Sequence, residues 1–282
     1  MSETTLARPT APTGSPASAR RRRVRPLPSA SAVLPWIVPL LVLIGWQWAS
    51  STGAISATIL PPPSKVFDTA ARLWSDGELQ RHLSVSVRRI VIGFGIGAAI
   101  GLALGFAVGL SRIAEGVVDR TLQMLRALPH LALVPLLIAA FGIGELPKIV
   151  LVTLGVIFPV YLNTVAGIRT VDPKLVQLGR SYGLRRGALI RQIVVPGAMP
   201  MILTGIRYAL GVAWLTLVVA ETIATSEGIG YLAQNGRDLL RNDRIVLAIV
   251  LYALAGLVAD QIIRLVEARV LRWNPNYRRG NR

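Results

Sequence analysis

The chain has 282 residues, 52% of them hydrophobic and only 16% charged, with a mean hydropathy of +0.54. This composition excludes an ordinary soluble globular protein and is typical of a membrane protein. The formal net charge of +17 is also found in nucleic-acid-binding proteins. Here, however, the basic residues are grouped between apolar runs without interleaved aromatic residues, so we expect no nucleic-acid partner and interpret the charge as membrane topology.

The first 32 residues are rich in Pro, Ser, Ala and Thr and contain a run of arginines. Such a segment cannot bury a core, so residues 1–32 are predicted to be a disordered basic tail. An apolar run follows at 33–49, with Trp36, Trp46 and Trp48 near its ends, as in the aromatic belt of a membrane helix. The hydrophobic region of a cleaved signal peptide is the alternative, but the near-complete spanning length favours a retained helix.

Five further apolar runs approach the roughly 20 residues that cross a bilayer core of about 30 Å. We therefore expect an all-α, polytopic membrane protein with about six transmembrane helices. Its transmembrane domain would occupy 33–268, followed by a basic C-terminal tail at 269–282. The five runs lie at 89–111, 126–141, 148–168, 201–223 and 245–266.

The second run carries glycines at every fourth position, on one helical stripe. This pattern allows another helix to approach closely, either within the chain, which we favour, or across a dimer seam. The glycines are Gly93, Gly97, Gly101, Gly105 and Gly109.

Lysine and arginine gather in four segments: the N-terminal tail, the links after the second and fourth runs, and the C-terminal tail. With six spans, all four segments lie on the same side of the membrane. An excess of Lys and Arg marks the cytoplasmic side, so both termini are expected to be cytoplasmic.

The link after the fourth run, residues 169–200, is here called the elbow, and it is longer than a simple turn requires. Asp172 is expected to cap a short helix that starts at Pro173, and Gly183 to end that helix in a left-handed conformation. A second amphipathic piece should follow and stop at Pro196, while Gly179, in mid-helix, should tolerate alanine. Two short helices that meet at a glycine suit either a docking site for a soluble partner or an interfacial linker.

Ionisable residues inside apolar spans cost about 2.5–3.5 kcal/mol and are therefore candidates for function. Arg207, in the fifth run, either reaches the cytoplasmic surface or belongs to a transport pathway. Glu221, near the outer end of that run, either contacts a gate or a binding protein or caps the interface. Asp260 precedes Arg264 by one helical turn, which predicts an ion pair between them.

Signatures of catalysis are missing from the sequence. None of its three lysines follows the glycine-rich pattern of a P-loop, and no HExxH motif or Gly-x-Ser-x-Gly elbow occurs. The chain has no cysteine, and His82 and His130 are far apart in sequence, so both are expected to be packed residues rather than metal ligands. We expect no enzyme activity and no cofactor on this chain.

Gly183, followed after nine residues by Ile193-Val194-Val195-Pro196, resembles the cytoplasmic loop of ABC-importer permease subunits. In that loop a Glu-Ala-Ala triplet, three residues, a glycine, nine residues and Ile-x-Leu-Pro dock into an ATPase. The triplet aligns with Gln177-Leu178-Gly179, and all three positions depart from it. The resemblance places the ATPase-coupling loop at Asp172, Pro173, Gln177, Leu178, Gly179, Arg180, Gly183, Ile193 and Pro196.

Further stretches, at 141–168, 205–222, 228–232 and 271–277, are similar to permeases of the aliphatic sulfonate, taurine and nitrate group, and most of all to aliphatic sulfonate permeases. The resemblance implies a type I ABC-importer permease fold in the bacterial cytoplasmic (inner) membrane. It also implies a homodimer, a pair of ATP-binding subunits that carry ATP and Mg, and an extracytoplasmic substrate-binding protein.

The function implied is inward translocation of a small organic anion, an aliphatic sulfonate, by alternating access, with Arg207 and Glu221 as candidates for the pathway or a gate. Alternatives within the class are permeases for taurine, nitrate or a thiamine-precursor pyrimidine. A secondary transporter would be expected to show inverted repeats or a midplane relay of acids and histidines, which the sequence lacks. A membrane anchor would have no use for the elbow.

Overall fold

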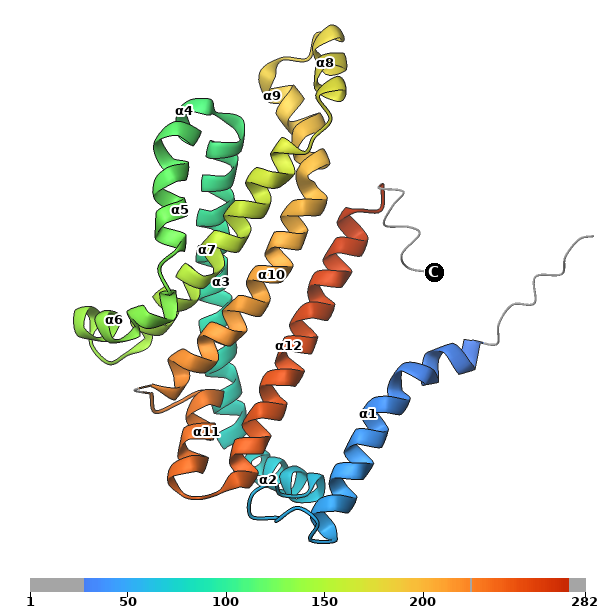
Figure 1. Ribbon diagram of the computed structural model, residues 1–282, viewed down its shortest axis with the longest axis vertical. Helices are drawn as coiled ribbons and strands as arrows, with labels where there is room; N and C mark the ends of the chain where they lie inside the picture. The colour runs from blue at the N-terminus through green and yellow to red at the C-terminus, as the bar shows by residue number, and fades with distance from the viewer. Residues whose placement is uncertain (1–27, 224, 274–282) are drawn as a thin grey trace, which may run out of the picture. The chain divides into compact units, whose positions relative to one another are not determined.

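The computed structural model describes residues 28–223 and 225–273, so the arginine run and the last nine residues of the predicted tails lie outside the described part. All regular secondary structure in that part is helical (Figure 1). The chain divides into two compact units, Met1–Gly45 and Trp46–Arg282. The first helix, α1 (Pro28–Ser51), covers the first predicted span and begins inside the segment predicted to be disordered.

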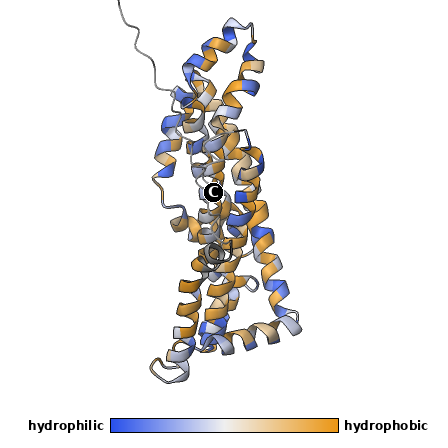
Figure 2. Ribbon diagram, turned by 90° about the vertical axis from the view of Figure 1, so that its right-hand side faces the viewer, coloured by the Kyte–Doolittle hydropathy of each residue, from blue (hydrophilic) through white to orange (hydrophobic). Residues whose placement is uncertain are grey.

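Four helices of the second unit are long and apolar enough to cross a membrane, and Figure 2 shows the apolar residues along them. They correspond to the second, fourth, fifth and sixth predicted spans. At 1.5 Å per residue the shortest of them, with 25 residues, is about 38 Å long and exceeds a hydrocarbon core of about 30 Å. They are α3 (Glu78–Leu110), α7 (Glu145–Arg169), α10 (Val195–Thr222) and α12 (Asn242–Val270).

The third predicted span, 126–141, is wrong as a single helix. Two helical segments, Arg112–Arg126 and His130–Phe141, meet there at an angle of 79°. Pro129 lies between them, and a proline disfavours helical backbone at the residue before it. By length and apolar composition, the described part has four helices that could cross a membrane, or five if this bent pair counts as one span. The apolar helix α1 covers the remaining predicted span, in accord with the expectation of about six. The segments are α4 (Arg112–Ala114), the π-helical turn η1 (Glu115–Asp119), α5 (Arg120–Arg126), the 3-10 turn η2 (His130–Leu133) and α6 (Val134–Phe141).

The glycine stripe of α3 packs against α7 of the same chain. A Cβ atom on Gly97 would lie 2.7 Å from the carbonyl oxygen of Thr153, and one on Gly101 would lie 2.7 Å from that of Ile157. These distances leave no room for a side chain, so the two backbones touch directly. Packing within the chain, the interpretation favoured above, is confirmed.

Contacts along the stripe advance in the same direction on both helices, from Gly93 against Val152 to Gly105 against Thr164. The helices α3 and α7 are therefore parallel, and the bent pair must carry the chain back between them. The bent pair thus reverses the direction of the chain, as a straight third span would. For this reason α7, α10 and α12 run in the directions that six spans predict.

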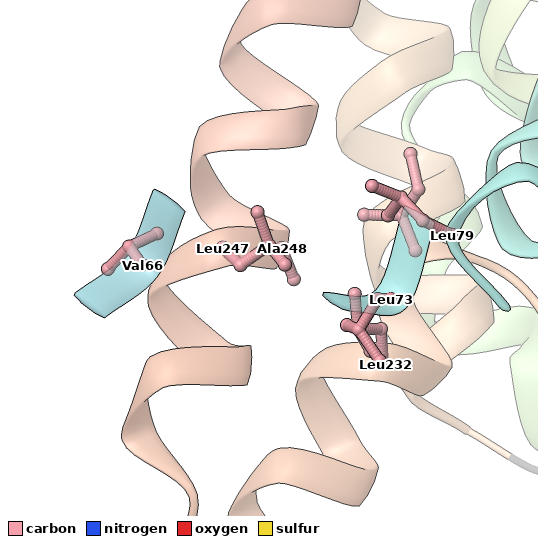
Figure 3. Close-up of a cluster of buried hydrophobic side chains, with 7 residues drawn as sticks. Val66, Leu73, Leu79, Leu232, Leu247 and Ala248 are labelled. Carbon is pink, nitrogen blue, oxygen red and sulfur yellow. The ribbon is translucent and has the colours of Figure 1, made fainter. Parts of the chain in front are cut away.

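Two short helices that the apolar pattern does not predict cover one end of the second unit: α2 (Pro63–Ser75) and α11 (Ile229–Asp238). Figure 3 shows the apolar cluster that holds them, in which Val66 and Leu73 of α2 pack with Leu232 of α11 and Leu247 of α12. The helix α2 is amphipathic and buries only this face.

The opposite end of this unit carries the elbow, formed by α8 (Pro173–Ser181) and α9 (Arg186–Leu189), together with the C-terminal end of α7 and the N-terminal end of α10 (Figure 1). The C-terminal ends of α3 and α12 point the same way. The basic residues of these segments thus gather toward one end: Arg112, Arg169, Lys174, Arg180, Arg185, Arg186, Arg191, Arg269 and Arg272.

Candidate functional site

The first elbow helix begins as its sequence predicted. The side chain of Asp172 accepts a hydrogen bond from the backbone N–H of Lys174 at 2.8 Å, and Pro173 occupies the first helical position. The cap satisfies an N–H group that has no partner within the helix, and proline gives up an N–H that would be free in any case.

Gly183 ends this helix with φ of +76°, also as predicted. Its N–H donates to the carbonyl of Arg180 at 2.9 Å, and the next N–H, of Leu184, donates to the carbonyl of Gly179 at 3.0 Å. This pair of bonds is the Schellman motif, which requires a left-handed residue at the position of Gly183. The sharp angle between α8 and α9 is therefore set by local chemistry.

The second elbow helix does not stop at Pro196, and that expectation was wrong. Helix α9 continues through a π-helical turn, η3 (Ile190–Val194), directly into α10, and the helical run from Arg186 to Thr222 has 37 residues. A proline lacks an N–H and crowds the preceding turn, and the wider π turn gives it room. The elbow is therefore continuous with a membrane-spanning helix.

The inner face of α8 packs against this continuous helix through Gly179. A Cβ atom there would lie 2.6 Å from Cδ1 of Ile193 and 3.3 Å from Cδ1 of Leu184. Gly179 is thus a close-packing position. An alanine there needs only a shift of the flexible end of the Ile193 side chain, so its tolerance of alanine stays a prediction. Because Gln177-Leu178-Gly179 replaces the family triplet, glycine here lets α8 sit directly on Ile193.

The outer face of α8 presents an apolar stripe to solvent. Leu175, Leu178 and Tyr182 are 51%, 53% and 80% exposed. Gln177 and Arg180 flank this stripe and are exposed as well. An apolar stripe rimmed by polar groups is typical of a surface that binds another protein.

At the end of the unit opposite the elbow, Glu221 lies in a buried polar network and is completely shielded from solvent. Its carboxylate is 2.7 Å from Nη1 of Arg89 and accepts hydrogen bonds from the hydroxyls of Ser86 and Tyr252 and from the N–H of Gly230. A buried charge is tolerated only when it is paired and hydrogen-bonded in this way. In this state the carboxylate offers no surface to a binding protein.

Arg89 joins Glu221 to a second acid. Its Nε donates to Oε2 of Glu145 at 2.8 Å, and its Nη1 also donates to the carbonyl of Glu227 at 2.8 Å. Lys148 is buried nearby and donates to the carbonyl of Gly144. The network therefore ties together α3, α7, α10, α11 and α12. The sequence pattern did not identify Arg89 as a functional candidate. Arg89 stands at the very start of the second apolar run, and a basic residue commonly flanks a membrane span at that position.

Arg207 pairs with a neighbouring helix. Its Nε is 2.7 Å from Oδ1 of Asp260, and Oδ2 of the same carboxylate accepts from Nε of Arg264 at 2.7 Å. The predicted pair of Asp260 and Arg264 is confirmed. The additional bond from Arg207 links α10 to α12 at this one level.

The two histidines are packed, as expected. His82 is buried, and its Nδ1 accepts a hydrogen bond from the N–H of Gly228. Nε2 of His130 lies 3.1 Å from the hydroxyl oxygen of Thr216. Each ring thus joins helices that are distant in sequence.

Comparison with known proteins relates this architecture to transport. Residues 92–272 match the family model described as binding-protein-dependent transport system inner membrane component. The chain is 54% identical, over 87% of its length and 93% of the relative, to a protein of Escherichia coli (strain K12) named as an aliphatic sulfonates transport permease. It is 33% identical, over 83% of its length and 87% of the relative, to the taurine transport system permease protein of the same organism.

A solved structure titled as an amino acid ABC transporter with histidines has the same fold, with a TM-score of 0.57 at 17% identity, over 71% of this chain and 97% of that one. The parallel, glycine-packed α3 and α7, the elbow and the family match agree with one another. The chain therefore belongs to the family of binding-protein-dependent transport system inner membrane components, and is a multi-pass permease of an ABC importer.

Proposed function

We propose that this permease imports aliphatic sulfonates by alternating access, driven by a separate pair of ATP-binding subunits that dock on the elbow. These subunits carry ATP and Mg, and the permease has no nucleotide site of its own. It acts as a homodimer in the bacterial inner membrane. The elbow end and both termini face the cytoplasm, and a substrate-binding protein engages the end formed by α2 and α11. The observation that carries this proposal is the exposed apolar stripe of the elbow.

The stripe is coupled mechanically to the membrane domain. Helix α8 sits on Ile193 through Gly179, and Ile193 belongs to the continuous helical run that ends at Thr222. A force applied at Leu178 by a docked subunit would therefore be transmitted through Ile193 to α10. The contact of α10 with α7 and the bond from Arg207 to Asp260 pass that motion to neighbouring helices.

The sulfonate substrate is supported by the degree of similarity. Identity to the aliphatic sulfonates permease is 54%, against 33% to the taurine permease. Taurine, nitrate and a thiamine-precursor pyrimidine remain the alternatives. Neither a secondary transporter nor a membrane anchor binds an ATPase, so neither alternative explains the elbow.

The substrate is tested by growth. A bacterial strain that lacks its own sulfonate permease, but keeps the matching ATPase and binding protein, should grow on ethanesulfonate as sole sulfur source when this chain is expressed. Growth on taurine but not on ethanesulfonate would reassign the substrate, and growth on neither would refute the proposal.

The docking surface is tested by a charge placed on it. Leu178→Glu should reduce co-purification of the ATP-binding subunit, because an ionised carboxylate resists burial in an apolar interface. Ile59→Glu is the matched control, since Ile59 is 73% exposed but lies outside the elbow. Equal retention of the ATPase by both variants would show that the stripe is not the contact.

A further inference from the structure

A cavity of about 430 Å³ lies between α5, η2, α7 and α10, which is within the usual range of roughly 300–1,000 Å³ for small-molecule sites. On α7 it is lined by residues from Leu154 to Asn163, the middle of a helix that runs from Glu145 to Arg169. On α10 it is lined by Tyr208 and Val212, again at mid-length. The cavity therefore lies near the bilayer midplane, where transporters commonly bind substrate.

Its lining is amphipathic. One part of the wall is apolar and includes Leu133, Leu154 and Phe158. The polar groups come from four different elements: Arg126 at the end of α5, His130 in η2, Asn163 on α7 and Tyr208 on α10. Neither Asp nor Glu occurs among the lining residues. The cavity therefore combines positive charge, neutral hydrogen-bonding groups and apolar surface without a carboxylate.

Arg126 is the charged group of this cavity. It is exposed, and it forms no ion pair with any residue in the described part of the chain. An arginine near the membrane centre is costly unless an anion or water satisfies it. The planar guanidinium offers two parallel N–H donors, a geometry that matches two oxygens of one oxyanion.

Gly155 keeps part of the cavity open. A Cβ atom there would lie 3.0 Å from the hydroxyl oxygen of Thr216 and 3.4 Å from Nε2 of His130. The missing side chain lets this polar pair lie close to α7, and His130 of the pair lines the cavity. On the other side, the amide of Asn163 is held in place by donation to the carbonyl of Pro159 at 2.8 Å.

We propose that this cavity binds the aliphatic sulfonate during its passage through the membrane, with the sulfonate oxygens on Arg126 and the alkyl chain against the apolar wall. The inference rests on the function proposed above and extends it to substrate choice. An ammonium group, as in taurine, meets no counter-charge on this wall, and nitrate has no alkyl chain to bury. The cavity thus favours an apolar tail next to an anionic head.

The test uses the complete importer, with its ATPase and binding protein, reconstituted in liposomes. Arg126→Gln should lower the initial rate of ethanesulfonate uptake on the order of tenfold, because it removes a charge-assisted hydrogen bond to the anion. Arg126→Lys should retain part of the rate. Arg120→Gln is the matched control, since Arg120 lies exposed on the same helix but does not line the cavity.

A second variant tests the apolar wall, by a readout that general damage to the fold would not produce. Val212→Phe should shrink the cavity and lower octanesulfonate uptake relative to ethanesulfonate, whereas Arg126→Gln should lower both alike. Wild-type uptake rates and chain-length profiles in both variants would refute the cavity while leaving the sulfonate importer intact. A wild-type importer that carries no alkanesulfonate at all would refute the proposed function, and the site with it.

Discussion

Replacing Gly183 with valine tests whether the elbow geometry transmits the motion of the ATPase. Gly183 has φ of +76°, and a Cβ atom added there meets nothing within 4 Å. Steric contact with neighbours therefore contributes nothing, and the whole cost is backbone strain. For a residue with a Cβ atom that strain is about 1–3 kcal/mol, and a β-branched side chain lies toward the upper end of the range.

A strain of about 2 kcal/mol shifts the equilibrium of the turn roughly 30-fold, since each 1.4 kcal/mol is a factor of ten. The turn escapes the strain by giving up its two Schellman hydrogen bonds, which rotates α8 away from Ile193. Gly183 itself lies outside the long apolar helices, so membrane insertion should be unaffected. We expect Gly183→Val to reach the membrane at normal levels, to retain little ATPase on co-purification, and to support little growth on ethanesulfonate.

Two further substitutions separate strain from bulk. Gly183→Asn adds a side chain but tolerates the left-handed conformation, so it should retain most of the ATPase. Gly187→Ala adds a methyl group on α9 at a position where nothing lies within 4 Å, and it should behave like the wild type. Equal ATPase retention and uptake by Gly183→Val and wild type would show that the elbow is only a linker.

Three other outcomes are expected. Glu221→Leu removes one of the two acids that pair with the buried Arg89, together with the acceptor for Ser86, Tyr252 and Gly230. It should cost at least about 1–3 kcal/mol, seen as a lower Tm of the purified protein, and an unchanged Tm would contradict the buried network. Gly101→Val should force α3 from α7 and reduce the yield of folded protein, whereas Gly95→Val, with nothing within 4 Å, should not; equal yields would contradict the glycine packing. Ser181→Cys should react only with permeant thiol reagents and Asp76→Cys also with impermeant ones, and the reverse pattern would invert the proposed orientation.

The features that the sequence predicted correctly depend on interactions between near neighbours. Asp172 caps a helix two residues away, and Gly183 closes it through bonds that reach back three and five residues. The pair of Asp260 and Arg264 spans a single turn. Such contacts follow from residue identity and spacing alone, because the backbone between the partners has few alternatives.

The wrong span prediction arose because hydropathy averaged over many residues does not register the effect of a single proline on the backbone. The run 126–141 is apolar apart from Arg126 and His130, so hydropathy predicts a single span. Yet Pro129 breaks it, and the segments on either side meet at 79°. At Pro196 the error was the opposite one: the proline predicts the end of a helix, but a π-helical turn before it lets the helix continue. A proline restricts the local backbone, but the packing around it decides whether the helix breaks or continues.

Composition and residue spacing are enough to identify a membrane chain, to locate most of its spans, to define both ends of the first elbow helix, and to recognise the family motif. Three features emerge only in the folded chain: the glycine stripe meets α7, Arg89 pairs with Glu221 across 132 residues, and Arg126 and Tyr208 share one cavity. Each of these depends on which faces of distant helices meet. Many pairings satisfy the same apolar pattern, and close packing of the whole chain selects one of them.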